Sequence, residues 1–234
     1  MRILSIYTLG WVLVTALCLA QSPRQEQETI TGRYHIYAAG KHIETDEFRI
    51  VQGKRGMDEI KSIAGDRKLE IEVTYENGKL QSYQQTLNGL PGLRATVSSN
   101  LISFYENEAM TGALTIGKEM YIFEPTVSSH YWFLLHGYDK ISGGKQSIEV
   151  VWPSQQDFIK LEIERHGSDG LKCGERKIDA VHYRIAIGRR DQANVWVDGY
   201  RIIAIHLVSK NLCMVDAGYE QLHQQIASVL KRGI

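Results

Sequence analysis

From residue 30 onward, apolar and polar residues alternate with a period of two in one stretch after another. The alternation is strict over 69–75, Leu-Glu-Ile-Glu-Val-Thr-Tyr. It returns over 159–163, 181–187 and 203–207. Because successive side chains of a strand point to opposite faces, this pattern is typical of strands with one buried and one solvated face. Sheets of that kind are antiparallel, so we expect a mainly β, antiparallel fold.

Short turn signals separate the alternating stretches. Asn77-Gly78 is the strongest, because both residues tolerate the positive φ angles of a type I′ hairpin turn. Together the signals delimit roughly ten to twelve strands. No proline- or serine-rich linker interrupts them, so 30–234 is predicted to be a single β-rich domain. The other turn signals are Gly40-Lys41, Gly65-Asp66, Ser142-Gly143-Gly144, Ser168-Asp169-Gly170 and Asp198-Gly199.

Two segments have a helical period instead. Residues 128–138 follow a proline, open with two serines able to cap a helix, and repeat large apolar side chains at helical spacing. Residues 217–232 carry one apolar stripe and end in Lys231 and Arg232, which suit the C-terminal end of a helix dipole. We therefore expect one short inserted helix and one C-terminal helix.

A long meander must cover its apolar face, either by closing into a barrel or by curling around something. The two helices are the available plugs. The predicted architecture is a long antiparallel meander curled into a half-barrel or open barrel, with both helices against its concave face.

The N-terminus has the features of an export signal. Arg2 precedes an apolar run that ends in small residues at 18–20, which predicts a secretory signal peptide over 1–20. The polar residues 21–29 are predicted to be a disordered leader. Two alternatives are lipidation at Cys18 and retention of the run as a membrane anchor. Export predicts a periplasmic or secreted protein whose membrane contact, if any, is through an uncleaved signal.

Beyond the signal there are two cysteines, Cys173 and Cys213. An oxidising compartment would permit one disulfide between them. The alternative is two separately buried thiols. Two cysteines at this spacing do not make a zinc site by themselves.

The sequence contains none of the common catalytic or cofactor-binding motifs that were sought. The chain lacks Gly-x-Ser-x-Gly, His-Glu-x-x-His and phosphate-binding glycine patterns, so no catalytic set, metal or cofactor is predicted. With 27 basic and 27 acidic residues and no basic run, nucleic acid is not an expected partner. The acidic side chains Glu44, Asp46 and Glu47, and likewise Glu162 and Glu164, are interpreted as a solvated, ion-rich surface.

Aromatic residues are the most suggestive feature. They cluster in 131–138 and recur on the predicted strands, and ring-rich concave walls suit apolar ligands. The alternative is that they simply fill a core. The candidate ligand-binding residues are Tyr131, Trp132, Leu135, Tyr138, Tyr183 and Trp196.

An exported chain with a long meander and a plugging helix resembles the lipoprotein-carrier (LolA/LolB-like) half-barrels. It is also similar to a wider set of exported bacterial proteins of uncharacterised function, in the strand-turn-strand at 34–41 and the strand-Asp-x-Gly-strand at 194–205. Carriers of this type bind acyl chains in their concavity, so the resemblance implies a hydrophobic ligand there and no catalytic set. The chain departs from them in having more strands and a C-terminal helix.

Three functional hypotheses follow. The first is binding of a lipid, acyl chain or other hydrophobic small molecule in the concave face. The second is an envelope enzyme, with His130, Tyr131 and His136 as acid–base groups. The third is a structural or adaptor protein that pairs with an envelope protein through an edge strand, for which the polar segment 79–87 is the candidate.

Overall fold

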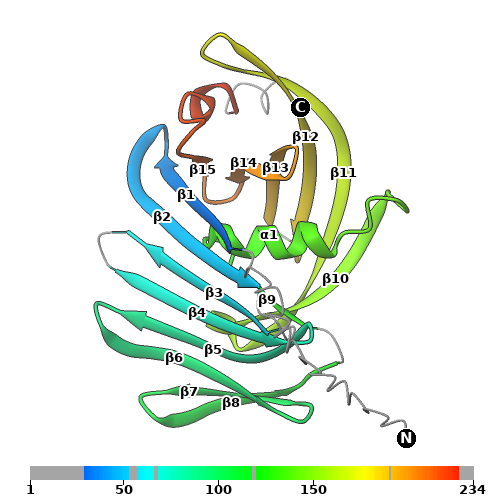
Figure 1. Ribbon diagram of the computed structural model, residues 1–234. Coiled ribbons are helices and arrows are strands. Elements are labelled where there is room, and N and C mark those ends of the chain that lie inside the picture. Colours follow the sequence, from blue (N-terminus) through cyan, green and yellow to red (C-terminus); the bar gives the residue numbers. More distant parts are fainter. Residues whose placement is uncertain (1–28, 53–56, 66–67, 118–119, 190, 227–234) are drawn as a thin grey trace, which may run out of the picture.

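The described strands form a single sheet of 15 (Figure 1). The computed structural model describes residues 29–52, 57–65, 68–117, 120–189 and 191–226. The strands are β1 (Thr29–Ala38), β2 (Lys41–Gln52), β3 (Met57–Ala64), β4 (Leu69–Glu76), β5 (Lys79–Leu87), β6 (Leu90–Ser98), β7 (Leu101–Glu106), β8 (Ala109–Thr115), β9 (Tyr121–Ile122), β10 (Lys145–Trp152), β11 (Asp157–Cys173), β12 (Arg176–Ile187), β13 (Asp191–Asp198), β14 (Arg201–Leu207) and β15 (Leu212–Asp216).

Two meanders meet at the centre of this sheet. Strand β1 pairs with β2 on one side and with β15 on the other, so the order runs from β8 down to β1 and then from β15 down to β9. Neighbours are antiparallel except β9 and β10, which run parallel because helix α1 (Ser128–Gly137) connects them. A 3₁₀ turn, η1 (Pro153–Gln155), follows β10. The sheet does not close, but it curls far enough for the Ile122 amide on β9 to donate to the Tyr75 hydroxyl on β4 at 3.0 Å.

The expected mainly β, open-barrel architecture is confirmed, with more strands than the ten to twelve predicted. The Asn77-Gly78 turn is confirmed, since both residues have positive φ angles. An equivalent Asn88-Gly89 pair, also at positive φ, joins β5 to β6 and had not been counted. The predicted turn at 168–170 was wrong, because these residues lie inside the long strand β11.

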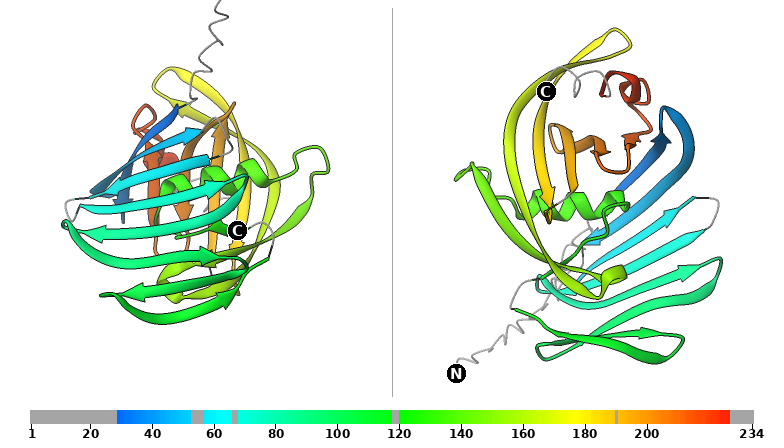
Figure 2. Two further views of the ribbon diagram at one scale, coloured as in Figure 1. Left: turned by 60° about the horizontal axis from the view of Figure 1, so that its bottom comes forward. Right: turned by 180° about the vertical axis from the view of Figure 1, so that it is seen from behind.

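Helix α1 lies across the inside of the curve, as Figure 1 and both views of Figure 2 show. It is buried on almost every side, including Tyr131, Leu134 and Leu135, and so is not the amphipathic plug expected from its spacing. The inward side chains of the sheet pack around it in one apolar cluster, the inner core, which includes Ile50 and Phe104.

A second apolar cluster covers the opposite face of β11–β15. This outer core contains Trp196, Ile203 and Val215 from the sheet, and Leu222 and Ile226 from the chain that follows β15. The predicted C-terminal helix over 217–232 is described as helical over 222–226, and 227–232 lie outside the described residues. Its placement against the concave face was wrong, because β12–β15 carry apolar side chains on both faces and need a second cover.

The polar segment 79–87 is not an edge. It forms β5, which pairs with β4 and β6, and the sheet's edges are β8 and β9. Its inward residues Leu80 and Tyr83 are fully buried, while Gln84 between Tyr83 and Gln85 is exposed on the outer face. The small number of large apolar residues in this segment therefore indicated a polar outer face, and not a position at the edge of the sheet.

The predicted signal peptide at 1–20 lies outside the described residues, as does the leader at 21–29 apart from Thr29, which begins β1. Within the described part of the chain, no helix is both long and apolar enough to cross a bilayer.

Candidate functional site

A cavity of about 440 Å³ opens between the C-terminal half of α1 and the concave face of the sheet. Its walls come from the inward register of β12–β14 and from the start of β1. They are apolar or aromatic: Ile30, Trp132, Leu135, Tyr183, Val197 and Ile202. The alternation that makes these strands amphipathic on their inner side is thus what lines the cavity.

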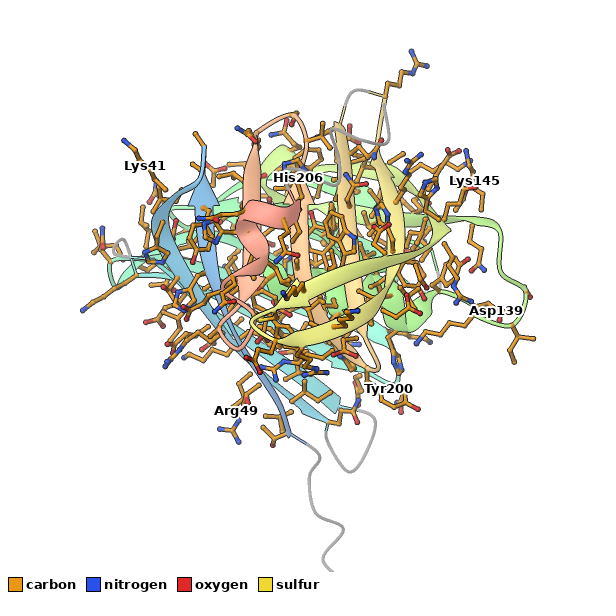
Figure 3. All side chains as sticks on the ribbon, turned by 90° about the horizontal axis from the view of Figure 1, so that it is seen from above. Lys41, Arg49, Asp139, Lys145, Tyr200 and His206 are labelled. Atoms are coloured by element: carbon orange, nitrogen blue, oxygen red, sulfur yellow. The ribbon has the colours of Figure 1, made fainter. Side chains whose placement is uncertain are left out.

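Polar side chains gather around the cavity's mouth. They are Gln52 at the end of β2, His136 on the last turn of α1, Lys140 just after it, and Tyr200 in the turn between β13 and β14. Tyr200 is 93% exposed, and the Lys140 ammonium lies 6.0 Å from the centre of its ring. In Figure 3, Tyr200 and Asp139 lie toward the same end of the molecule, away from Lys41 and His206.

Three of the six residues predicted to bind a ligand line this cavity. Trp132 and Leu135 reach it from α1, and Tyr183 from β12. Trp132 stacks against His136 with ring centres 5.0 Å apart. The Trp132 ring is part of the cavity wall, and the His136 ring lies at the cavity's mouth.

Tyr131 and Tyr138 lie behind the wall. The Tyr131 hydroxyl donates to the Pro125 carbonyl at 2.9 Å, and its ring packs against Phe123 in the inner core. Tyr138 donates to the Gly144 carbonyl at 2.7 Å and packs edge-on against Tyr183. These two tyrosines therefore support the cavity rather than line it.

Trp196 is on the other face of the sheet. Val195 and Val197 point inward from β13, so Trp196 between them points outward and joins the outer core. Its indole nitrogen donates to Asp169 at 2.8 Å, and its ring stacks on His182 at 4.7 Å. Its predicted place with the other rings was wrong, because β13 is buried on both faces.

The residues that sequence reasoning missed are mainly those of the mouth. Gln52, Lys140 and Tyr200 lie at the ends of elements, where no periodicity marks them. Tyr200 carried a signal nonetheless, since it follows Asp198-Gly199 within the same predicted turn, and turns run over the protein surface.

A buried carboxylate from the sheet holds the opposite end of α1. The backbone amide and hydroxyl of Ser128 both donate to Asp46 Oδ2, at 2.9 and 2.5 Å. Ser129 is hydrogen-bonded to Ser62 at 2.7 Å. Because the helix's own N-cap, Val127, has no side-chain acceptor, Asp46 supplies the negative group that a helix N-terminus favours.

Asp46 is fully buried, so its interpretation as a solvated surface carboxylate was wrong. It shares the inward register of β2 with Phe48 and Ile50. Burial raises its pKa to about 6, against the lowering effect of the two bonds from Ser128. Its second oxygen, Oδ1, has no hydrogen-bond partner among the described residues, which leaves the ionised form incompletely stabilised.

The predicted acid–base histidines are separated. His130 is buried, its Nδ1 accepts from the Glu124 amide at 2.8 Å, and burial lowers its pKa to about 3. His136 is at the cavity's rim, while Tyr131 is in the inner core with a pKa that burial raises well above its usual range. This arrangement does not form an acid–base cluster around one cleft.

Cys173 and Cys213 are free thiols in the structure, the first half-buried and the second buried. Cys173 is half-buried at the tip of β11, where its Sγ contacts the Gly218 carbonyl at 4.0 Å. Cys213 is buried on β15, beside a smaller cavity of about 210 Å³ that His206 and His223 also line. Across the described residues, no group of three or more His, Cys, Asp or Glu side chains is arranged to hold a metal ion.

We expect the two thiols to differ in reactivity. Burial raises the pKa of Cys213 to about 12, and only the thiolate is the nucleophile. In a Cys18→Ser background, one thiol should react quickly with a disulfide reagent, and Cys173→Ser should remove that phase. Cys213 should react about a hundredfold more slowly until denaturant is added. Equal rates, or no reaction at either thiol, would contradict this arrangement.

The chain matches no family model and no curated protein. Among solved structures, it is similar to a β-barrel-like protein of a domain of unknown function, DUF1849, from Brucella abortus. The two share 8% sequence identity with a TM-score of 0.48, over 81% of this chain and 94% of that one. The resemblance to the lipoprotein carriers is not confirmed and stays a prediction.

Proposed function

We propose that this protein binds a hydrophobic ligand, such as an acyl chain or lipid, in the cavity beside α1. The observation that carries the proposal is an open cavity of about 440 Å³ whose walls are apolar and aromatic and whose polar groups stand at its mouth. Small-molecule sites are typically of roughly this kind and size, about 300–1,000 Å³ with few polar groups.

Burial of the ligand's apolar surface would supply the affinity, at about 25 cal/mol per Å² removed from water. We expect the ligand to enter where the exposed side chains of His136, Lys140 and Tyr200 line the cavity. Asp46 holds the N-terminal end of α1, and the hydrogen bond from Tyr138 to Gly144 holds its C-terminal end, so these side chains, and not the helix, are expected to shift. The C-terminal helical residues 222–226 cover the outer core and are not a gate for this cavity.

The two other hypotheses are less well supported by the geometry. The buried, neutral His130 is unsuited to proton transfer near neutral pH. The adaptor hypothesis named 79–87 as its edge strand, but this segment forms β5, which is an interior strand. We therefore advance ligand binding as the function.

Filling the cavity should abolish binding. Ile30 is a half-buried residue of the cavity wall, so Ile30→Trp should be tolerated while it occupies the space a ligand needs. We expect at least about a tenfold weaker affinity for the neutral fluorescent probe N-phenyl-1-naphthylamine, measured by fluorescence titration. The matched control is Ile43→Trp, at a position on β2 that is 51% exposed, which should leave the affinity unchanged.

Circular dichroism would confirm that both variants fold. Should Ile30→Trp prove unstable, Val197→Phe fills the same cavity from β13. Unchanged probe affinity in a folded cavity-filling variant, or no probe binding by the unmodified protein, would overturn the proposal.

A further inference from the structure

The polar groups that line the cavity are hydrogen-bond donors and a cation, without an acidic side chain among the described residues. None of the ten described residues that line it is acidic, and Lys140 is the one that carries a full charge. The other polar groups at the mouth, from Gln52, His136 and Tyr200, can each donate a hydrogen bond. The apolar interior suits the chain of an amphiphile, and the donors and the cation at the mouth suit an anionic headgroup.

Lys140 is available for such a contact. Within the described residues its ammonium has no carboxylate at ion-pair distance, and its contact is with the face of Tyr200 at 6.0 Å. Asp139, its sequence neighbour, is occupied by its own loop, where it accepts from the amides of Ile141 and Ser142 at 2.9 and 3.1 Å. The nearest acid in sequence therefore serves the loop's conformation.

The loop that carries Lys140 is well anchored to β10. The Asp139 amide donates to Gln146 Oε1 at 2.9 Å, and Gln146 Nε2 donates back to the Asp139 carbonyl at 2.7 Å. Tyr138, just before it, is bonded to Gly144. Because this loop is fixed at both ends, the backbone of Lys140 is held beside the mouth, and only its side chain has to become ordered to meet a headgroup.

From these features we infer that the ligand is an anionic amphiphile, with its chain in the cavity and its carboxylate or phosphate headgroup at Lys140. This inference rests on the proposed function and adds the charge of the headgroup and the residue that recognises it. The shared chemistry is the anion; a free fatty acid and a phosphate-bearing lipid are its two sources.

Competition among ligands with one chain and different headgroups tests the inference. The probe N-phenyl-1-naphthylamine would be displaced with dodecanoate, dodecyl phosphate, dodecanol and dodecyltrimethylammonium, with the alcohol below its solubility limit and the others below their micelle concentrations. We expect the anions to bind about fivefold more tightly than the alcohol, as suits a partly exposed charge pair, and the cation to bind most weakly. Added salt should reduce the preference. Whichever anion binds more tightly identifies the source.

Lys140→Met keeps most of the side chain's apolar volume and removes its charge. It should weaken binding of the anions to the level of the alcohol and leave the affinity for the alcohol unchanged. The control is Lys145→Met on β10, whose ammonium is already 3.4 Å from Glu162 and which should keep the anion preference.

The outcomes separate the two proposals. If the four compounds compete equally and Lys140→Met changes nothing, the headgroup inference is wrong and hydrophobic binding stands. If the probe does not bind and no compound binds, the proposed function fails and the inference fails with it.

Discussion

Arg201→Ala is expected to lower the free energy of unfolding by about 3 kcal/mol, because it leaves a buried carboxylate without its cation. Asp216, at the end of β15, is 1% exposed and accepts two hydrogen bonds from the Arg201 guanidinium, at 2.7 and 2.8 Å. Its remaining bond comes from the Gly218 amide at 2.9 Å. The pair thus fixes the point where the chain leaves the sheet to cover the outer core, and its loss should loosen that cover.

Chemical denaturation with circular dichroism measures this effect. Arg33→Ala is a matched control, because Arg33 and Glu47 are also 2.7 Å apart but 60% and 53% exposed. Surface pairs of that kind contribute about 0.2–1 kcal/mol, so this variant should lose less than 1 kcal/mol. Equal losses in the two variants would mean that burial of Asp216 does not govern the pair's contribution.

Asp46 is expected to make stability depend on pH in the direction opposite to a salt-bridged carboxylate. Its pKa is about 6 in the folded protein and 3.8 ordinarily, so between these values the folded state binds more protons than the unfolded state. The free energy of unfolding therefore falls as pH rises through this window. The contribution is fully present below pH 3.8 and lost above pH 6, and amounts to about 3 kcal/mol.

Asp46→Asn isolates this effect, since every other titrating group is common to both proteins. The asparagine oxygen can still accept from Ser128, but it does not titrate. Denaturation at pH 4 and pH 7 should show the unmodified protein gaining about 2–3 kcal/mol relative to the variant at the lower pH. A stability difference that stays constant with pH would show that Asp46 titrates normally in the folded protein.

Strand identity and the open-barrel class could be predicted from the sequence where one face is wet. Residues 69–75 alternate because β4 buries Ile71, Val73 and Tyr75 and leaves Glu72 exposed and Thr74 half-buried between them. Helix α1 could be located because its large apolar side chains recur at helical spacing.

The face on which a residue lies could not be predicted where both faces are buried. In β13 and β14 the apolar residues are nearly continuous, so the alternation that separates inside from outside disappears. Trp196 was assigned to the wrong face for this reason, and the C-terminal helix with it. A register shift next to Val197 complicates the pattern further.

Half of the predicted site residues line the cavity, and its charged rim was not foreseen. Trp132, Leu135 and Tyr183 belong to regular elements, so their spacing indicated that they share a wall. Lys140 and Tyr200 come together across a gap of sixty residues in two separate loops, and no local pattern joins them. Asp46 lay among acidic neighbours, and only its shared register with Phe48 and Ile50 distinguished it.

Native mass spectrometry of the delipidated protein mixed with dodecanoate measures whether the cavity beside α1 holds a ligand. We predict a one-to-one adduct in the unmodified protein and in Ile43→Trp, and the bare mass in Ile30→Trp. Retention of the adduct by Ile30→Trp would place the ligand elsewhere on the molecule. A bare mass for the unmodified protein would contradict ligand binding in the cavity beside α1.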